Sequence, residues 1–211
     1  MWAPSGVRRR QLLVDRLMMF PLGTAKKPAK YILYYNPEGA IEAVLAPLYF
    51  EDFKPGMVFD SSLSGSLSPR AIFSKKRVEE FAVVTGDKNL LHTDPEFAKT
   101  TILKDVVVHG RLAGLDKLFG LLDKIGFWSG SLEALTSDNT NYFAPVYPNR
   151  DWIRYALDVV ETKEVEKYPD KGIVKFHFLS TNQKGKRVSE GNFTVMLRRR
   201  EFYPVIPKVS R

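Results

Sequence analysis

An acid, an amide and an imidazole lie within six residues of one another in the middle of the chain. These residues are Asp87, Asn89 and His92, and a second imidazole, His109, follows a short distance later. Histidine titrates near neutral pH, so His92 can both accept and donate a proton. A neighbouring carboxylate can orient the ring or share the proton transfer. The residue types therefore suit acid–base chemistry near pH 7.

The glycine after the second histidine, Gly110, has no side chain, so a substrate oxygen can approach its backbone N–H. If Gly110 begins a helix, the helix dipole adds positive potential at that point. A structural explanation is also open at this stage. A Gly-Asp-x-Asn turn commonly just ends a helix, and a His-Gly pair commonly just begins the next one.

The elements around these residues can be predicted from spacing. Ser74 suits the N-cap of a helix that carries Val78, Phe81 and Ala82 on one face. Pro95 stops regular helix soon after His92, so the acid and the imidazole lie on a connecting segment that can fold back over a pocket. From His109 to about residue 125, apolar residues recur at helical spacing and predict a largely buried helix. They are Leu112, Leu115, Leu118, Phe119 and Leu122.

The last third of the chain alternates apolar with polar residues, as half-buried strands do. One long helix followed by antiparallel strands favours an α+β fold in which the sheet wraps the helix. Nearer the N-terminus, residues 31–35 and 40–45 flank an Asn-Pro-Glu-Gly turn and predict a hairpin. Residues 61–68, rich in serine and glycine, predict a loop. The alternating sets are Ile153, Tyr155, Leu157 and Val159; Val174, Phe176 and Phe178; and Phe193, Val195 and Leu197.

The charge of the chain is unevenly distributed. The formal net charge is +8, but residues 1–30 hold seven bases and one acid, which leaves +2 for the other 181 residues. This leader is either an organelle-targeting peptide or a solvated basic tail. Because no second stripe of basic and aromatic residues accompanies it, nucleic-acid binding is not expected. The chain has no cysteine and no apolar run of roughly 20 residues, which excludes thiolate chemistry and predicts no membrane span.

The register of the central segment resembles that of the MaoC-like, or type 2, enoyl-CoA hydratases and (3R)-hydroxyacyl dehydratases of the hot-dog fold. The later His109-Gly110 pair resembles the start of that family's central helix, and residues 143–148 resemble its next strand. The similarity runs from about Glu51 to Leu197. There are two departures: Leu90 replaces the usual proline, and Arg111 replaces a common apolar residue. The matching positions are Phe81, Val84, Thr85, Gly86, Asp87, Asn89, Leu91, His92 and Ala98.

The resemblance implies a hydro-lyase that acts on acyl thioesters of CoA or acyl carrier protein. Asp87 and His92 would be the catalytic pair, the Gly110 N–H would bind the oxyanion, and Asn89 and His109 would orient them. Neither a metal nor another cofactor is implied, and two domains of this family commonly join their sheets as a homodimer. The implied organisation is a basic leader (1–30), a hairpin-like extension (31–50), one hot-dog domain (51–200) and a C-terminal tail (201–211).

Other hypotheses remain open from the sequence. The chain could be a non-catalytic hot-dog scaffold in a larger assembly, or an acyl thioesterase. A zinc site built from His92, Asp94 and His109 is conceivable, although Asp94 also suits a helix cap. The basic run 198–200 is either a solvated strand end or a phosphate-attracting site. The leader would place the protein in mitochondria, and without targeting it would be cytoplasmic.

Overall fold

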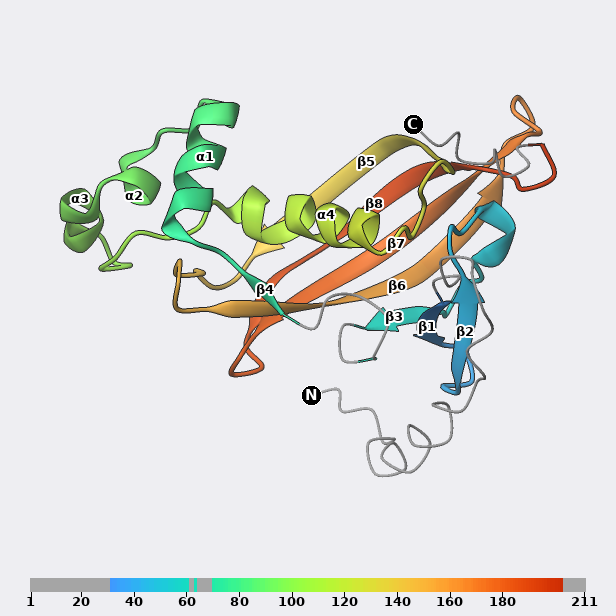
Figure 1. Cartoon of the computed structure of the whole chain (residues 1–211), viewed down its shortest axis with the longest axis horizontal. Coiled ribbons are helices and arrows are strands. Elements are labelled where there is room, and N and C mark those ends of the chain that lie inside the picture. Colours follow the sequence, from blue (N-terminus) through green and yellow to red (C-terminus); the bar gives the residue numbers. More distant parts are fainter. Residues whose placement is uncertain (1–30, 61–62, 64–69, 203–211) are drawn as a thin grey trace, which may run out of the picture.

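A single antiparallel sheet curves around a central helical segment in the computed structural model, which describes residues 31–60, 63 and 70–202 (Figure 1). The sheet order is β2-β1-β3-β6-β7-β8-β5, and β4 pairs separately with β6. The predicted α+β fold is therefore confirmed. The strands are β1 (Tyr31–Tyr35), β2 (Ile41–Leu45), β3 (Val58–Asp60), β4 (Ala71–Ile72), β5 (Leu132–Tyr142), β6 (Trp152–Glu164), β7 (Lys171–Asn182) and β8 (Arg187–Arg198).

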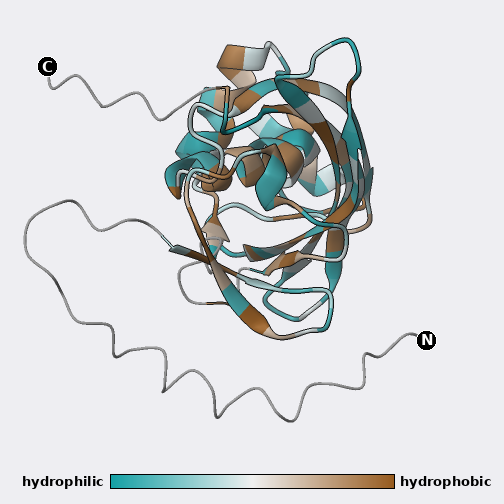
Figure 2. Cartoon of the chain, turned by 90° about the vertical axis from the view of Figure 1, so that its right-hand side faces the viewer, coloured by the Kyte–Doolittle hydropathy of each residue, from teal (hydrophilic) through white to brown (hydrophobic). Residues whose placement is uncertain are grey.

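The three long strands β6, β7 and β8 alternate between a buried inner face and a partly exposed outer face. The apolar sets predicted from the sequence all lie on the inner face, where their side chains are at most 2% exposed. Figure 2 shows the sheet curved around the helices that this face packs against. Burial of these aliphatic and aromatic side chains supplies most of the drive to wrap the sheet.

The N-terminal hairpin is present in the structure and extends the sheet. β1 and β2 pair antiparallel about a turn in which Asn36 Oδ1 accepts from the Ala40 N–H at 2.8 Å. β1 then pairs with β3 through Tyr35 and Val58. The basic leader, most of the predicted 61–68 loop and residues 203–211 lie outside the described residues.

The central helix is not continuous, contrary to the prediction. Helical backbone begins at Gly110, passes through a wide turn over Leu112–Asp116 and continues as α4 (Lys117–Lys124). Gly114 interrupts the helix with φ −93° and ψ −117°. The buried Tyr155 hydroxyl donates to the Ala113 carbonyl at 2.6 Å, so a carbonyl beside the break has a partner. Burial raises the pKa of Tyr155 well above its usual range, which keeps this hydroxyl a donor.

The strand that follows the central helix lies earlier than expected. Residues 143–148 are not a strand; they form the loop after β5, and Pro145 and Pro148 lack the N–H that a sheet ladder requires. β5 itself was not predicted because its residues are mostly polar and exposed. Among the described residues it pairs only with β8, so it is an edge strand and lacks the apolar alternation of a buried strand.

The bond between Tyr155 and the helix break can be tested. Tyr155→Phe keeps the buried ring but leaves the Ala113 carbonyl without its donor, and we expect the free energy of unfolding to fall by about 1–3 kcal/mol. Urea denaturation measures this change. Tyr168→Phe, which alters a tyrosine whose side chain is partly exposed, is the matched control and should change stability little. Equal stability of the two variants would show that the hydroxyl does not stabilise the break.

Candidate active site

The end of helix α1 (Lys75–Thr85) delivers Asp87 to the site. Ser74 caps the start of this helix by accepting the Arg77 N–H at 3.1 Å, as predicted. Gly86 ends it with φ 77°, in the left-handed region that glycine adopts without strain. Asp87 therefore follows immediately after a sharp change of direction, and its side chain is 53% exposed.

A short helix, α2 (Leu90–Thr93), holds His92. The side-chain oxygen of Asn89 accepts the Leu91 N–H at 3.0 Å and so caps this helix. Asn89 therefore positions His92 by fixing the turn on which the imidazole stands. Leu90 occupies the first helical position, where proline is well tolerated because that N–H needs no intrahelical partner. The departure from the family pattern at Leu90 thus leaves the helix intact.

Asp94 caps the next helix, α3 (Pro95–Thr100). Its carboxylate accepts the backbone N–H groups of Glu96 and Phe97 at 2.8 and 3.1 Å. The Asp94 carboxylate is therefore used as a helix cap, which is the role that the sequence offered as the alternative to a zinc ligand. It is not available to a zinc site with His92 and His109.

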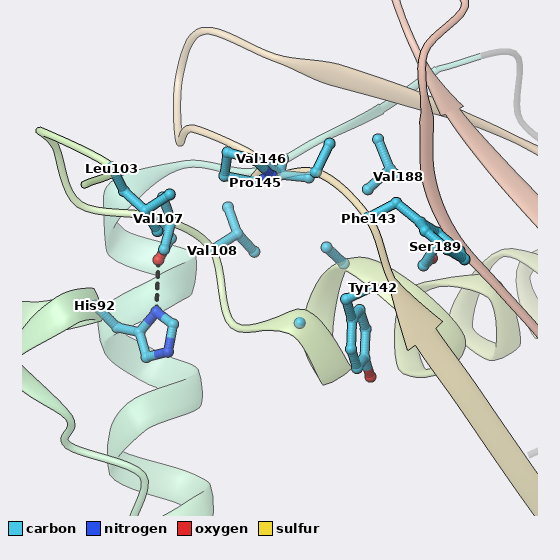
Figure 3. A pocket seen from close by; sticks show the side chains of 13 residues that line it. His92, Leu103, Val107, Val108, Tyr142, Phe143, Pro145, Val146, Val188 and Ser189 are labelled. Carbon is cyan, nitrogen blue, oxygen red and sulfur yellow. Dashed lines mark hydrogen bonds between the residues drawn. The ribbon is translucent and has the colours of Figure 1, made fainter. Parts of the chain in front are cut away.

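His92 has one ring nitrogen committed and one available. Its Nδ1 lies 2.7 Å from the carbonyl oxygen of Val107 (Figure 3). A carbonyl can only accept, so Nδ1 carries the hydrogen and the lone pair of the neutral ring is on Nε2. Burial is the largest effect on this group and lowers the pKa of His92. The ring is therefore neutral near pH 7, with Nε2 ready to take a proton.

His109 is almost completely buried, with 2% of the residue exposed. Its Nε2 donates to the backbone carbonyl of Asp87 at 3.0 Å, and its ring stacks on that of His92 with centroids 3.9 Å apart. The Asp87 carboxylate lies 4.0 Å from the same Nε2. Nδ1 of His109 has no hydrogen-bond partner among the described residues. His109 thus holds both the backbone of the acid and the face of the other imidazole.

The structure brings three proton-binding groups together. One nitrogen of His92, one of His109 and a carboxylate oxygen of Asp87 all lie within 4.8 Å of one another. A water molecule placed among them can contact the carboxylate and the free nitrogen of His92. The same atoms could serve as metal ligands, but a metal ion would occupy the lone pair that acid–base chemistry requires.

A mostly apolar cavity of about 370 Å³ opens beside His92. Tyr142 and Phe143 are 50% and 44% exposed and lie at its mouth, whereas Val188 and Ser189 are nearly fully buried and form its floor. Figure 3 shows these side chains facing the same space as His92. The remaining lining residues are Leu103, Val107, Val108, Gly110, Ala113, Ala144, Pro145 and Val146.

Gly110 lies in the cavity wall at the start of the central helix. The first N–H groups of a helix have no intrahelical acceptor, so they are available to an oxygen atom in the cavity. The ring of Tyr142 packs so closely that a Cβ on residue 110 would lie 3.0 Å from Tyr142 Cε1. Only glycine fits here without moving that ring. The importance of Tyr142 was not predicted, because it lies 32 positions from Gly110 in the sequence.

The other charged residues singled out in the sequence have structural partners. Arg111 donates to Asp116 at 2.9 Å and to Asp138 at 2.5 Å, so it joins the central helix to β5. His177 lies between Asp158 and Glu190 on the outer face of the sheet. The basic run 198–200 is fully paired, with Glu133, Glu164 and Asp52 respectively.

An antiparallel sheet wrapped around a central helix, with a carboxylate and two imidazoles beside the helix start, defines a hot-dog-fold protein with an acid–base site. The MaoC like domain family matches residues 53–176, more than half of the chain. The chain belongs to this MaoC-like dehydratase family. A comparison with curated proteins gives no match.

Solved structures show the same fold. The monoamine oxidase regulatory protein of Archaeoglobus fulgidus is 25% identical, with a TM-score of 0.62 over 72% of this chain and 95% of that one. A MaoC-like dehydratase from Rhodospirillum rubrum is 21% identical, with a TM-score of 0.61 over 72% and 98% of the two chains. The R-hydratase PhaJ1 of Pseudomonas aeruginosa is 20% identical, with a TM-score of 0.56 over 78% and 97%. Within the residues that the structure describes, no helix is long and apolar enough to cross a membrane.

The protonation state of His92 gives a direct test of the site. Because burial lowers its pKa, we expect the ring to titrate below the ordinary value of about 6.5 and to carry its hydrogen on Nδ1 when neutral. NMR of ¹⁵N-labelled imidazoles, recorded from pH 8 downward, reports both properties, and His92→Gln assigns the signal. Titration at or above the ordinary value would contradict this arrangement.

Proposed function

We propose that the protein catalyses the reversible hydration of trans-2-enoyl thioesters and the reverse dehydration of (3R)-3-hydroxyacyl thioesters. The observation that carries the proposal is that a carboxylate oxygen of Asp87 and a ring nitrogen of His92 lie within 4.8 Å of each other, beside a cavity whose wall includes Gly110. Membership of the MaoC-like family supports the reaction class. The proteins that share the fold include an R-hydratase, PhaJ1 of Pseudomonas aeruginosa.

In the hydration direction, the pair would hold one water molecule on one face of the enoyl group. His92 Nε2 takes a proton as the water oxygen bonds to C3, and the imidazolium beside Asp87 then returns a proton to C2. Both new bonds form on the same face of the double bond, so addition is syn, and we propose that the face presented to the water is the one that gives the (3R) product. The same groups act in reverse during dehydration, which makes the reaction reversible.

Negative charge develops on the thioester oxygen before C2 is protonated. The Gly110 N–H at the helix start would donate to this oxygen, and a donor of this kind is worth about 3 kcal/mol in the transition state. The wide turn at Leu112–Asp116 and the ring of Tyr142 shape the space in which that oxygen would lie. The apolar cavity suits the reactive end of an acyl thioester, because it excludes bulk water.

Two alternative functions, a thioesterase and a non-catalytic scaffold, can be distinguished from the hydro-lyase by their products. A hot-dog thioesterase would release free CoA, and a non-catalytic scaffold would turn over no thioester. The chemistry favours the hydro-lyase, since a scaffold needs neither an available His92 nitrogen nor a side-chain-free residue 110. We further propose a mitochondrial location with a role in fatty-acid metabolism, which the basic leader (1–30) supports.

The proposed reaction predicts loss of the enoyl absorbance when purified protein is given crotonyl-CoA, with the (3R) product on chiral analysis. Asp87→Asn and His92→Gln should each lower kcat by about 10²–10⁴-fold, because the first removes the carboxylate that helps to hold the water beside the imidazolium and the second removes the proton-transfer group. Two matched variants, Asp123→Asn on α4 and His177→Gln on the outer face of the sheet, should keep wild-type rates. Circular dichroism confirms that all four variants are folded.

The outcomes separate the candidates. Free CoA without hydration indicates the thioesterase, and the absence of turnover on both CoA and carrier-protein thioesters indicates the scaffold. An (S) product would overturn the proposed face of attack on C3.

We also propose a homodimer formed by β5. This edge strand is eleven residues long, mostly exposed and, within the described part of the chain, paired on one side only. A long exposed edge offers unpaired backbone groups to a second chain.

Leu135→Lys places a charge on this edge and should shift the protein to monomer in light scattering. Leu45→Lys, on the five-residue edge strand β2, is the control and should leave a dimer. A monomeric wild type, or a dimer insensitive to Leu135→Lys, would argue against this interface.

A further inference from the structure

Exposed cations lie just before the cavity-lining residues Val188 and Ser189 in the chain. The turn between β7 and β8 carries Lys184 and Lys186, and β8 begins at Arg187; these three exposed residues are here called the mouth cations. In Figure 1 this turn lies at the same end of the sheet as the start of β6. Gln183 fixes the turn there, since its Nε2 donates to Asp151 at 2.7 Å and its Oε1 accepts the Trp152 N–H at 3.2 Å.

Arg187 connects this turn to the mouth itself. Its guanidinium lies 3.8 Å from the ring centroid of Phe143, which lines the cavity. The Phe143 N–H donates to the carbonyl of Val188, another lining residue, at 2.8 Å. Nη1 of Arg187 pairs with Glu190 at 2.7 Å, while 52% of the side chain stays exposed. The guanidinium is therefore held at the rim, and about half of the side chain remains open to solvent.

Two further arginines lie on aromatic rings just before and at the start of β6, the strand to which Gln183 holds the turn. Arg150 lies 3.7 Å from the ring centroid of Tyr147, and Arg154 lies 4.9 Å from that of Trp152. A guanidinium supported on an aromatic face keeps its planar N–H edge free for an anion, and that edge matches the oxygens of a phosphate.

Of the mouth cations, Arg187 has an acidic partner, whereas Lys184 and Lys186 have none among the described residues. Asp151 is buried and accepts from Gln183 and from the Tyr147 N–H, Asp105 pairs with Arg150, and Glu190 is shared by His177 and Arg187. The ammonium groups of Lys184 and Lys186 form no ion pair with a described residue. The basic run 198–200, by contrast, is paired and lies at the other end of β8, away from the cavity.

We propose that the mouth cations bind the phosphate of the phosphopantetheine arm that carries the acyl thioester. This inference rests on the proposed function, because it takes the thioester to lie in the cavity beside His92. The arm would leave the cavity between Tyr142 and Phe143, the exposed lining residues, and pass over the Phe143 ring towards Arg187. CoA and acyl carrier protein both carry this phosphate, so the proposed contact requires no other group of either carrier.

The test compares crotonyl-CoA with crotonyl-N-acetylcysteamine, a thioester that lacks phosphate. In the double variant Lys184→Gln/Lys186→Gln, the ratio of kcat/KM for the two substrates should fall by about tenfold through a higher KM for crotonyl-CoA. Adding Arg187→Gln should lower the ratio further. The wild-type ratio should also fall as salt is added, because exposed charges are screened.

Lys163→Gln/Lys167→Gln, which removes two exposed lysines from the opposite end of β6 and its following turn, is the matched control and should leave the ratio unchanged. An unchanged ratio in the Lys184/Lys186 variant, or an equal fall in the control, would overturn the proposal. Crotonyl-acyl carrier protein should show the same loss as crotonyl-CoA. A loss confined to crotonyl-CoA would assign the cations to the nucleotide phosphates and overturn the phosphopantetheine assignment.

Failure of the hydratase function is separable from failure of this site. If the wild type turns over neither thioester, calorimetry with CoA and with phosphate-free pantetheine still decides the question. Weaker CoA binding in the Lys184/Lys186 variant with no change in the control supports the phosphate site, and equal CoA binding in both overturns it.

Discussion

The buried imidazole of His109 is the contact on which the site depends. It donates to the backbone of Asp87, stacks on His92 and precedes the glycine that opens the central helix. Three segments that are separate in the sequence are thereby fixed relative to one another by one side chain. A buried ring that donates one hydrogen bond and stacks on another ring has little freedom to move, so the acid and the base keep their spacing without direct contact.

The same constraint explains why the helix departs from regular geometry. The helix must begin where His109 is held, yet its later turns must pack their leucines against the curved sheet. The break at Gly114 allows the start of the helix and its later turns to take different directions. The Tyr155 hydroxyl donates a hydrogen bond to the Ala113 carbonyl beside the break. Gly114 also lies against Tyr142 and Ser189, so the irregular turn contributes to the wall of the cavity as well as to the path of the chain.

Sequence reasoning predicted the α+β fold from local patterns, and the resemblance to the MaoC-like register implied the grouping of Asp87, His92 and Gly110. Alternation located β6, β7 and β8, and the capping signal of Ser74 located α1. It failed where a neighbour in space decides the outcome. The polar strand β5 exists because β8 pairs with it. The tautomer of His92 is set by the backbone carbonyl of Val107, and a backbone carbonyl in this position cannot be predicted from the residue type. Tyr142 was likewise missed, since only the folded chain brings it to Gly110.

Charge shows the same difference between sequence and space. The run 198–200 consists of three consecutive arginines, yet each arginine has an acidic partner from a distant segment. Lys184, Lys186 and Arg187 are spread over a turn and attract less notice in the sequence. Gln183 holds their turn to the start of β6, and Arg187 lies on the ring of Phe143 at the cavity mouth. Because the potential that a ligand meets depends on charge near its path that no acid neutralises, Lys184 and Lys186 are the cations of this group that can act most strongly on a substrate.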